Sequence, residues 1–179
     1  SFYFISGSGN KIAFSNKNLL KISKSLSIEQ NKFGVILSGG DTTFSNKLSF
    51  TITSLGYSNR IIYRNKAKLN DDIYVTGNLG DSFIGLQVLN KKIKIKKNLN
   101  KFFIDKYYKP DLPFKLSKHL FKFARTSIDI SDGLIDDLTK LINKQKLSFC
   151  LYEKKIPISQ NMENIIKEKK LKKMKLISN

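Results

Sequence analysis

The spacing of hydrophobic residues changes along the chain, and each change predicts a different element. Apolar side chains recur every three or four positions in residues 16–32, which predicts a helix that ends at Gly34. In residues 48–55, apolar side chains alternate with Thr and Ser, and this pattern predicts a strand. Short apolar runs that are also typical of strands lie at residues 35–37, 72–77, 126–130 and 147–152.

Helical spacing dominates the second half of the chain. We expect helices at residues 82–89, 98–108, 116–124, 133–143 and 158–169. The Gly- and Ser-rich residues 6–10 predict a flexible loop, and the polar, basic residues 59–70 predict a connection between two lobes. Because strands alternate with helices, the expected fold class is α/β, with helices and strands in α+β layers.

The amino-acid composition limits the classes of protein to which this chain can belong. The chain has 179 residues, of which 40% are hydrophobic and 26% charged, so it is long enough to bury a core as a globular protein. Its apolar runs are only a few residues long, which predicts no membrane partner and no signal peptide. Cys150 has no second cysteine to pair with, and this fits a reducing, cytoplasmic setting.

The formal net charge of +19 on its own suggests a polyanionic partner. However, only three of the 33 basic residues are Arg, the side chain best suited to bidentate contacts with phosphates and base edges. We therefore interpret most of the Lys residues as a solvated surface and expect no nucleic-acid partner. The positive field would still attract phosphorylated metabolites.

Residues 127–138, S-I-D-I-S-D-G-L-I-D-D-L, are the segment most suggestive of chemistry. Strand alternation would place Asp129 and Ser131 on one face, with Asp132 at the start of the following helix. Carboxylate and hydroxyl oxygens are the ligands that Mg²⁺ and its bound phosphates prefer. Helix capping would explain Ser131 or Asp132 but not Asp129, so we favour a metal or nucleotide site here.

Other acidic positions have simpler explanations. Gly40 and Asp41 lie in G-G-D-T-T, which could bring backbone N–H groups to a phosphate, although an ordinary turn explains this motif better. Asp81 or Ser82, in G-N-L-G-D-S, is best interpreted as a helix cap, with contact to a ligand as the weaker alternative. Asp136 and Asp137 follow one turn after Asp132, where the helix dipole favours acidic side chains.

Arg64 is a further candidate because arginine is so scarce in this chain. Its planar guanidinium suits a phosphate group. A solitary surface cation is an equally good interpretation, and the sequence pattern by itself leaves the choice open.

Taken in order, these motifs resemble those of the thiamine-monophosphate kinase family. The matching segments are G-G-D-T-T at residues 39–43, D-D-I-Y-V-T-G-N-L-G-D-S at 71–82, Y-Y-K-P at 107–110, I-D-I-S-D-G-L at 128–134 and K-I-P-I-S at 155–159. The resemblance implies a cytoplasmic enzyme that uses ATP and Mg²⁺ to phosphorylate thiamine monophosphate to thiamine diphosphate. It also implies the two-domain fold of the aminoimidazole ribonucleotide synthetase superfamily and a homodimer when full length.

The resemblance also assigns roles to individual positions. Residues 1–64 would be the C-terminal part of an N-terminal ATP-binding and dimerisation domain, and residues 65–179 the N-terminal part of a C-terminal α/β domain. The positions implied to bind ATP are Gly40, Asp41, Arg64 and Ser131. Those implied to hold Mg²⁺ are Asp41, Asp129 and Asp132.

The chain departs from the family pattern in two respects. Arg64 is followed by Asn65-Lys66-Ala67, where the family usually has Ser-Gly-Ala. The family's early Gly-Asp-Asp-Ala segment and its later Gly-Gly-Asp/Glu-Asp-Tyr segment are not found in these 179 residues. We therefore expect both domains to be incomplete and residues 1–179 alone to have little kinase activity.

Two alternatives stay open at this point. The first is another ATP-dependent enzyme of the same superfamily, of the purine-synthesis or selenophosphate type, and turnover of a formylglycinamidine substrate would favour it. The second is a basic, non-enzymatic polyanion-binding protein. Tight, sequence-tolerant nucleic-acid binding with a steep salt dependence would favour this second alternative.

Overall fold

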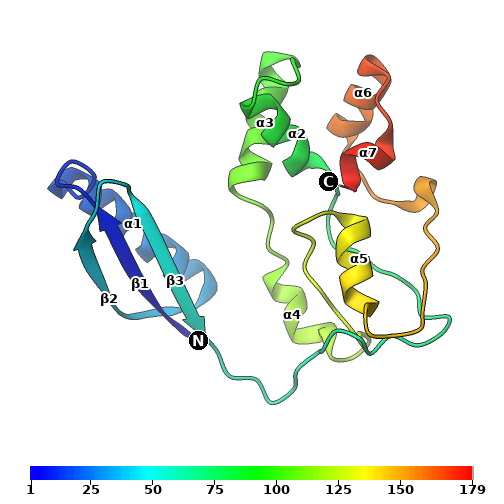
Figure 1. Cartoon of the computed structure of the whole chain (residues 1–179), viewed down its shortest axis with the longest axis horizontal. Coiled ribbons are helices and arrows are strands. Elements are labelled where there is room, and N and C mark those ends of the chain that lie inside the picture. Colours follow the sequence, from blue (N-terminus) through cyan, green and yellow to red (C-terminus); the bar gives the residue numbers. More distant parts are fainter. Residues whose placement is uncertain (179) are drawn as a thin grey trace. The chain divides into compact units, whose positions relative to one another are not determined.

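The structure, a computed structural model of the chain, describes residues 1–178 and divides into two units at Ile61 (Figure 1). Unit 1 is Ser1–Ile61, and unit 2 begins at Ile62. The last residue, Asn179, lies outside the described residues. None of the described helices is both long and apolar enough to cross a membrane.

Unit 1 is a three-stranded sheet with one helix. Its strands are β1 (Phe2–Gly9), β2 (Ile36–Phe44) and β3 (Ser49–Leu55), and their order in the sheet is β2-β1-β3. The central strand β1 runs parallel to β2 and antiparallel to β3. Helix α1 (Asn16–Phe33) connects β1 to β2 and ends at Gly34, whose φ of 62° is left-handed. The predicted helix at 16–32 and strand at 48–55 are confirmed.

The predicted loop at residues 6–10 is wrong, because Ser6 to Gly9 lie in the central strand β1. This stretch pairs with a neighbour on both sides, so its backbone hydrogen bonds are satisfied in spite of its turn-like composition. Space is tight here, since a Cβ at Gly7 would lie 3.0 Å from the Phe14 ring, which would have to shift to admit it. Packing under an aromatic ring thus explains the glycine better than flexibility does.

The predicted turn at Gly39-Gly40-Asp41 is also wrong, because strand β2 continues through all three residues to Phe44. A Cβ at Gly40 would overlap the backbone carbonyl oxygen of Ile5 on β1. Glycine at this position is therefore explained by close approach of two strands. The strand predicted at 35–37 is real but much longer than its apolar residues suggested.

Unit 2 is built from helices joined by irregular segments. The helices are α2 (Asp81–Leu89), α3 (Lys97–Tyr108), α4 (Phe114–Leu120), α5 (Leu134–Ile142), α6 (Gln160–Lys169) and α7 (Lys173–Ile177). All five helices expected in this part of the sequence are confirmed. Helix α7 and the short 3-10 helix Glu153–Lys155 had not been expected.

The core of unit 2 lies between these helices. Its fully buried side chains are Phe103, Ile84, Met162 and Ile165. Helices α2 and α3 lie side by side (Figure 1). A Cβ at Gly85 would overlap the carbonyl oxygen of Phe103, so the two helices approach backbone to backbone at this glycine.

The strands predicted at residues 72–77, 126–130 and 147–152 are absent from the described structure, and those predictions are wrong. A strand is held by hydrogen bonds to a paired neighbour, and these segments pair with no other described segment. Several of their large apolar side chains are correspondingly exposed, among them Tyr74, Ile130 and Tyr152. Apolar runs indicate that a segment can be buried in a sheet, but among the described residues no neighbouring strand pairs with these segments.

The contact at Gly85 gives a test of this packing. Helix propensity alone predicts that Gly85→Ala stabilises an interior helical position by about 1 kcal/mol. Because the added methyl group meets the Phe103 carbonyl, we expect a loss of roughly 1–3 kcal/mol in the free energy of unfolding instead. Chemical denaturation followed by circular dichroism measures it, with Ser25→Ala on α1 as the control for propensity. A stabilised Gly85→Ala variant would contradict the packing described.

Candidate functional site

The predicted acidic site is a loop that leads into helix α5, and we call residues 129–133 the acidic loop. Asp129, Ser131 and Asp132 are all exposed in it. Gly133 is buried immediately before α5, and its φ of 119° and ψ of 156° form a backbone conformation that favours glycine. The loop is irregular, so the expectation that Asp129 and Ser131 share one face of a strand is wrong.

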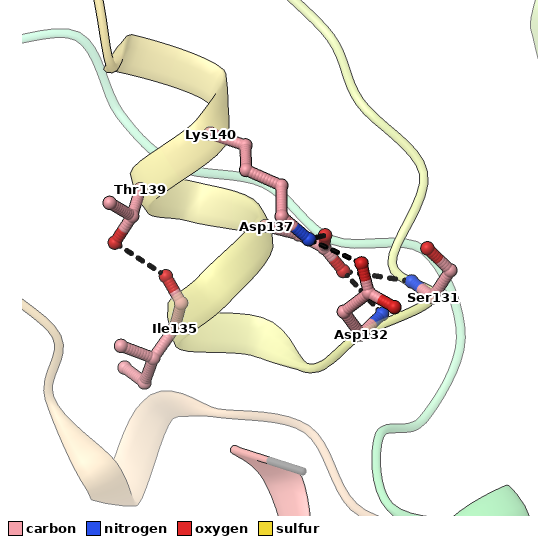
Figure 2. A network of polar contacts seen from close by, with 6 residues as sticks. All are labelled: Ser131, Asp132, Ile135, Asp137, Thr139 and Lys140. Atoms are coloured by element: carbon pink, nitrogen blue, oxygen red, sulfur yellow. Dashed lines mark hydrogen bonds and ion pairs between the residues drawn. The ribbon is translucent and has the colours of Figure 1, made fainter.

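Asp137, on the first turn of α5, organises this loop (Figure 2). Its side chain is only 3% exposed. Its Oδ2 accepts hydrogen bonds from the backbone N–H groups of Ser131, at 2.8 Å, and Asp132, at 2.9 Å. Lys140 donates to the other oxygen, Oδ1, at 3.0 Å and also forms an ion pair with Asp132. Asp137 is therefore a residue that sequence reasoning missed, since the helix-dipole interpretation gives it no partner in the loop.

These contacts shift the pKa values of Asp137 and Lys140. Burial by itself would raise the pKa of Asp137, but hydrogen bonds from Lys140, Asp132 and Ser131 outweigh it and lower the pKa below its ordinary value. The pKa of Lys140 is raised by its hydrogen bonds to Asp132 and Asp137. At neutral pH Asp137 is therefore ionised and Lys140 is protonated.

The oxygen atoms of the acidic loop suit Mg²⁺ in type but not in number. Asp129 and Asp132 contribute carboxylates and Ser131 a hydroxyl, the hard donors that this ion prefers. Asp132 is already paired with Lys140. In residues 1–178, no group of three or more His, Cys, Asp or Glu side chains is placed to hold a metal ion. If the loop holds Mg²⁺, it could supply only part of the coordination, and phosphate oxygens and water would have to complete it.

Asp41 lies in unit 1, on strand β2. Its carboxylate accepts the N–H of Thr42 at 2.7 Å and is exposed. The strand register pairs Asp41 with Ser6 and Ser6 with Thr51, so all three side chains lie on one face of the sheet. Because Asp41 and the acidic loop belong to different units, their convergence on one ligand stays a prediction. Arg64 is exposed near the start of unit 2.

A second buried acid, Asp81, connects two segments of unit 2. Its side chain accepts a hydrogen bond from the Ser159 hydroxyl at 2.6 Å, and Ser159 in turn caps α6 by accepting the Met162 N–H at 3.1 Å. The expectation that Asp81 caps its own helix is wrong, because Gly80 is the N-cap and makes no side-chain cap bond. Burial raises the pKa of Asp81 above its ordinary value. The hydrogen bond from Ser159 acts in the opposite direction but is the smaller effect.

Sequence comparison identifies relatives of known activity, although no protein-family model matches the chain. The thiamine-monophosphate kinase of Buchnera aphidicola subsp. Acyrthosiphon pisum is 39% identical over 145 residues, which are 79% of this chain and 45% of the relative. That of Leptospira interrogans is 32% identical over 146 residues, 80% of this chain and 48% of the relative. The chain thus spans about half the length of the curated relatives it matches.

Comparison with solved structures finds the same group of proteins. Thiamine monophosphate kinase from Aquifex aeolicus matches 99% of this chain with a TM-score of 0.87 and 22% identity, over 60% of its own length. AaThiL complexed with AMPPCP and TMP matches 99% with a TM-score of 0.85 and 22% identity, over 57% of its length. At this identity the match establishes the fold, and the expected aminoimidazole ribonucleotide synthetase-like α/β fold is confirmed.

The buried Asp81 generates a prediction about pH. Its raised pKa means that the folded state binds a proton more readily than the unfolded state, so this residue favours unfolding as the pH rises. We expect Asp81→Asn, which can still accept the Ser159 hydroxyl, to raise the melting temperature at pH 7 by a few degrees. The gain should shrink as the pH falls, because Asp81 itself then becomes protonated in the folded state.

Thermal unfolding between about pH 4 and 8 measures this difference, since Asp residues titrate near the lower end of that range. Asp105→Asn, at an exposed position of α3, is the matched control and should change stability little. A destabilised Asp81→Asn variant at pH 7, or a gain that persists unchanged in acid, would contradict the assignment.

Two lines of comparison, one of sequence and one of fold, agree on the same proteins. The sequence matches exceed 30% identity, and the fold match extends over nearly all of the chain. The resemblance first noted in the ordered motifs is therefore confirmed. Over the residues compared, the chain is similar in sequence and in fold to thiamine-monophosphate kinases.

Proposed function

We propose that this chain is part of an enzyme that transfers the γ-phosphoryl group of ATP to thiamine monophosphate and forms thiamine diphosphate. The observation that carries the proposal is the identity to curated thiamine-monophosphate kinases across four fifths of the chain. The complex of AaThiL with AMPPCP and TMP, which shares the fold, supports the choice of ATP and thiamine monophosphate as ligands.

In this proposal the acidic loop meets the nucleotide phosphates. Asp129 makes no hydrogen bond or ion pair with another described residue, so its carboxylate is available to a cation. The Ser131 hydroxyl would donate to a phosphate oxygen, and Asp132 would join Asp129 as a ligand. Mg²⁺, when bound, supplies neutralisation of the charge that develops on the transferred phosphoryl group. The chain's contribution is to hold these oxygen donors in place.

Two further positions would complete the nucleotide contacts. Strand β2 is at an edge of the three-stranded sheet, so backbone groups near Gly40 can reach a ligand without an intervening side chain. Asp41 beside it would be the third metal ligand. The exposed guanidinium of Arg64 would contact a phosphate through a planar pair of hydrogen bonds.

The proposal extends to the setting of the full-length protein. We place it in the cytoplasm as a homodimer, with a domain boundary at residue 64. The division of the described structure at Ile61 lies close to that boundary and supports it. Exposed apolar side chains on β2 and β3, such as Ile36 and Ile52, are compatible with burial against a further segment or subunit.

A chimera tests both the function and the role of Asp129. The 145 residues of the Buchnera kinase that match this chain would be replaced by the corresponding residues of this chain, which restores the remaining length of the relative. We expect the chimera to form thiamine diphosphate from ATP, Mg²⁺ and thiamine monophosphate. Asp129→Asn in the chimera should lower kcat/KM about 100-fold, because a lost metal ligand costs several kcal/mol of charge stabilisation.

Two controls make the chimera informative. Asp136→Asn removes the same charge from an exposed position on the first turn of α5, and it should change kcat/KM less than about threefold, as is usual for a surface substitution. Asp81→Asn should weaken Mg·ATP binding less than Asp129→Asn does. A folded chimera that remains inactive would contradict the proposed function, and equal effects of Asp129→Asn and Asp136→Asn would contradict the site.

A further inference from the structure

We propose that Asp137 is a positioning residue whose buried carboxylate fixes the shape of the acidic loop and thereby directs Ser131 and Asp132 towards their ligand. The shape of the loop is independent of any assumption about activity. Only the statement about the ligand rests on the proposed function. Figure 2 shows the network from which the inference starts.

The carboxylate of Asp137 holds two consecutive peptide groups, and we call this pair of hydrogen bonds the clamp. One carboxylate oxygen of Asp137 accepts the N–H groups of both Ser131 and Asp132, at 2.8 and 2.9 Å. Two hydrogen bonds to one atom restrict the orientation of both peptide planes, and therefore the directions in which the two side chains leave the backbone. Gly133 then turns the chain into α5 with a backbone conformation that other residues rarely adopt.

The helix dipole does not account for this arrangement. Asp136 occupies the same first turn of α5 and is exposed, which is sufficient for a favourable interaction with the dipole. Asp137 is instead buried, where an ionised carboxylate is costly unless it is fully hydrogen-bonded. The loop N–H groups and Lys140 satisfy it. Conversely, without Asp137 the two N–H groups would lose their acceptor in a partly buried position.

Lys140 extends the clamp to a side chain of the loop. Its ammonium group lies between Asp137, on its own helix, and Asp132, in the loop. Asp132 is therefore tied to α5 through both its backbone and its carboxylate. Asp129 is outside this network, and its direction is set by the backbone that the network holds. In the loop, the Asp132 carboxylate is therefore paired with Lys140, whereas the Asp129 carboxylate has no partner among the described residues.

Amide hydrogen exchange, resolved by residue with NMR on the 179-residue chain, tests the positioning role without any ligand. In the unmodified chain, the Ser131 and Asp132 amides should exchange more slowly than other loop amides. Asp137→Ala should accelerate exchange at these two amides by about tenfold relative to core amides such as that of Ile84, because their acceptor is removed. Asp136→Ala, the matched control, should leave both rates unchanged.

Asp137→Asn separates a local clamp from a general loss of stability. Its amide oxygen can still accept both N–H groups, so it should restore most of the protection that Asp137→Ala removes. Equal rates in the Ala and Asn variants, or unprotected Ser131 and Asp132 amides in the unmodified chain, would overturn the proposal. Because protection of the Ser131 and Asp132 amides is measured on the unmodified chain, this second comparison remains decisive if Asp137→Ala fails to fold.

Titration of the chimera with Mg·AMPPCP tests the consequence for the ligand. We expect Asp137→Ala to weaken binding about tenfold, Asp137→Asn to recover most of the loss and Asp136→Ala to have no effect, as for an outer residue that orients a ligand group. If the unmodified chimera fails to bind Mg·AMPPCP, the proposed function is contradicted. The exchange rates still decide whether Asp137 shapes the loop, so the two failures are distinguishable.

Discussion

The acidic loop depends on one interaction, the pair of hydrogen bonds from the backbone of Ser131 and Asp132 to the buried carboxylate of Asp137. A loop that carries exposed acids tends to open, because its charges repel one another and its peptide groups prefer water. Here a third acid, Asp137, is buried next to the loop, where it pairs with Lys140 and accepts hydrogen bonds from two backbone N–H groups. In the proposed function, this arrangement leaves the Asp129 carboxylate and the Ser131 hydroxyl available to a ligand.

A second constraint is that strands need partners, and it explains the contrast between the two units. In unit 1, the Gly- and Ser-rich strand β1 forms because β2 and β3 lie on either side of it. In unit 2, residues 126–130 have a clear strand pattern yet remain irregular beside a well-packed set of helices. The helices can fold because their contacts, such as that of Gly85 with Phe103, are made within the unit.

This contrast also shows what the sequence could predict. Helices such as α1 and α5 were predicted because their apolar spacing and their terminal glycines, Gly34 and Gly133, are local signals. Strand β1 was missed because its pairing is non-local and its composition is that of a loop. The candidate residues of the acidic loop were found from their chemistry. The role of Asp137 was not, because its partners in the loop are backbone N–H groups, which no side-chain pattern reveals.

The central claim is that the acidic loop binds a divalent cation together with a nucleotide. Its most direct test replaces Mg²⁺ by paramagnetic Mn²⁺ with AMPPCP and records the backbone amide spectrum of the chain. Selective broadening of Asp129, Ser131 and Asp132, with Lys97 at the start of α3 unaffected, is the result that the account predicts. Broadening spread over the lysine-rich surface, or an acidic loop that keeps its full signal intensity, would contradict it.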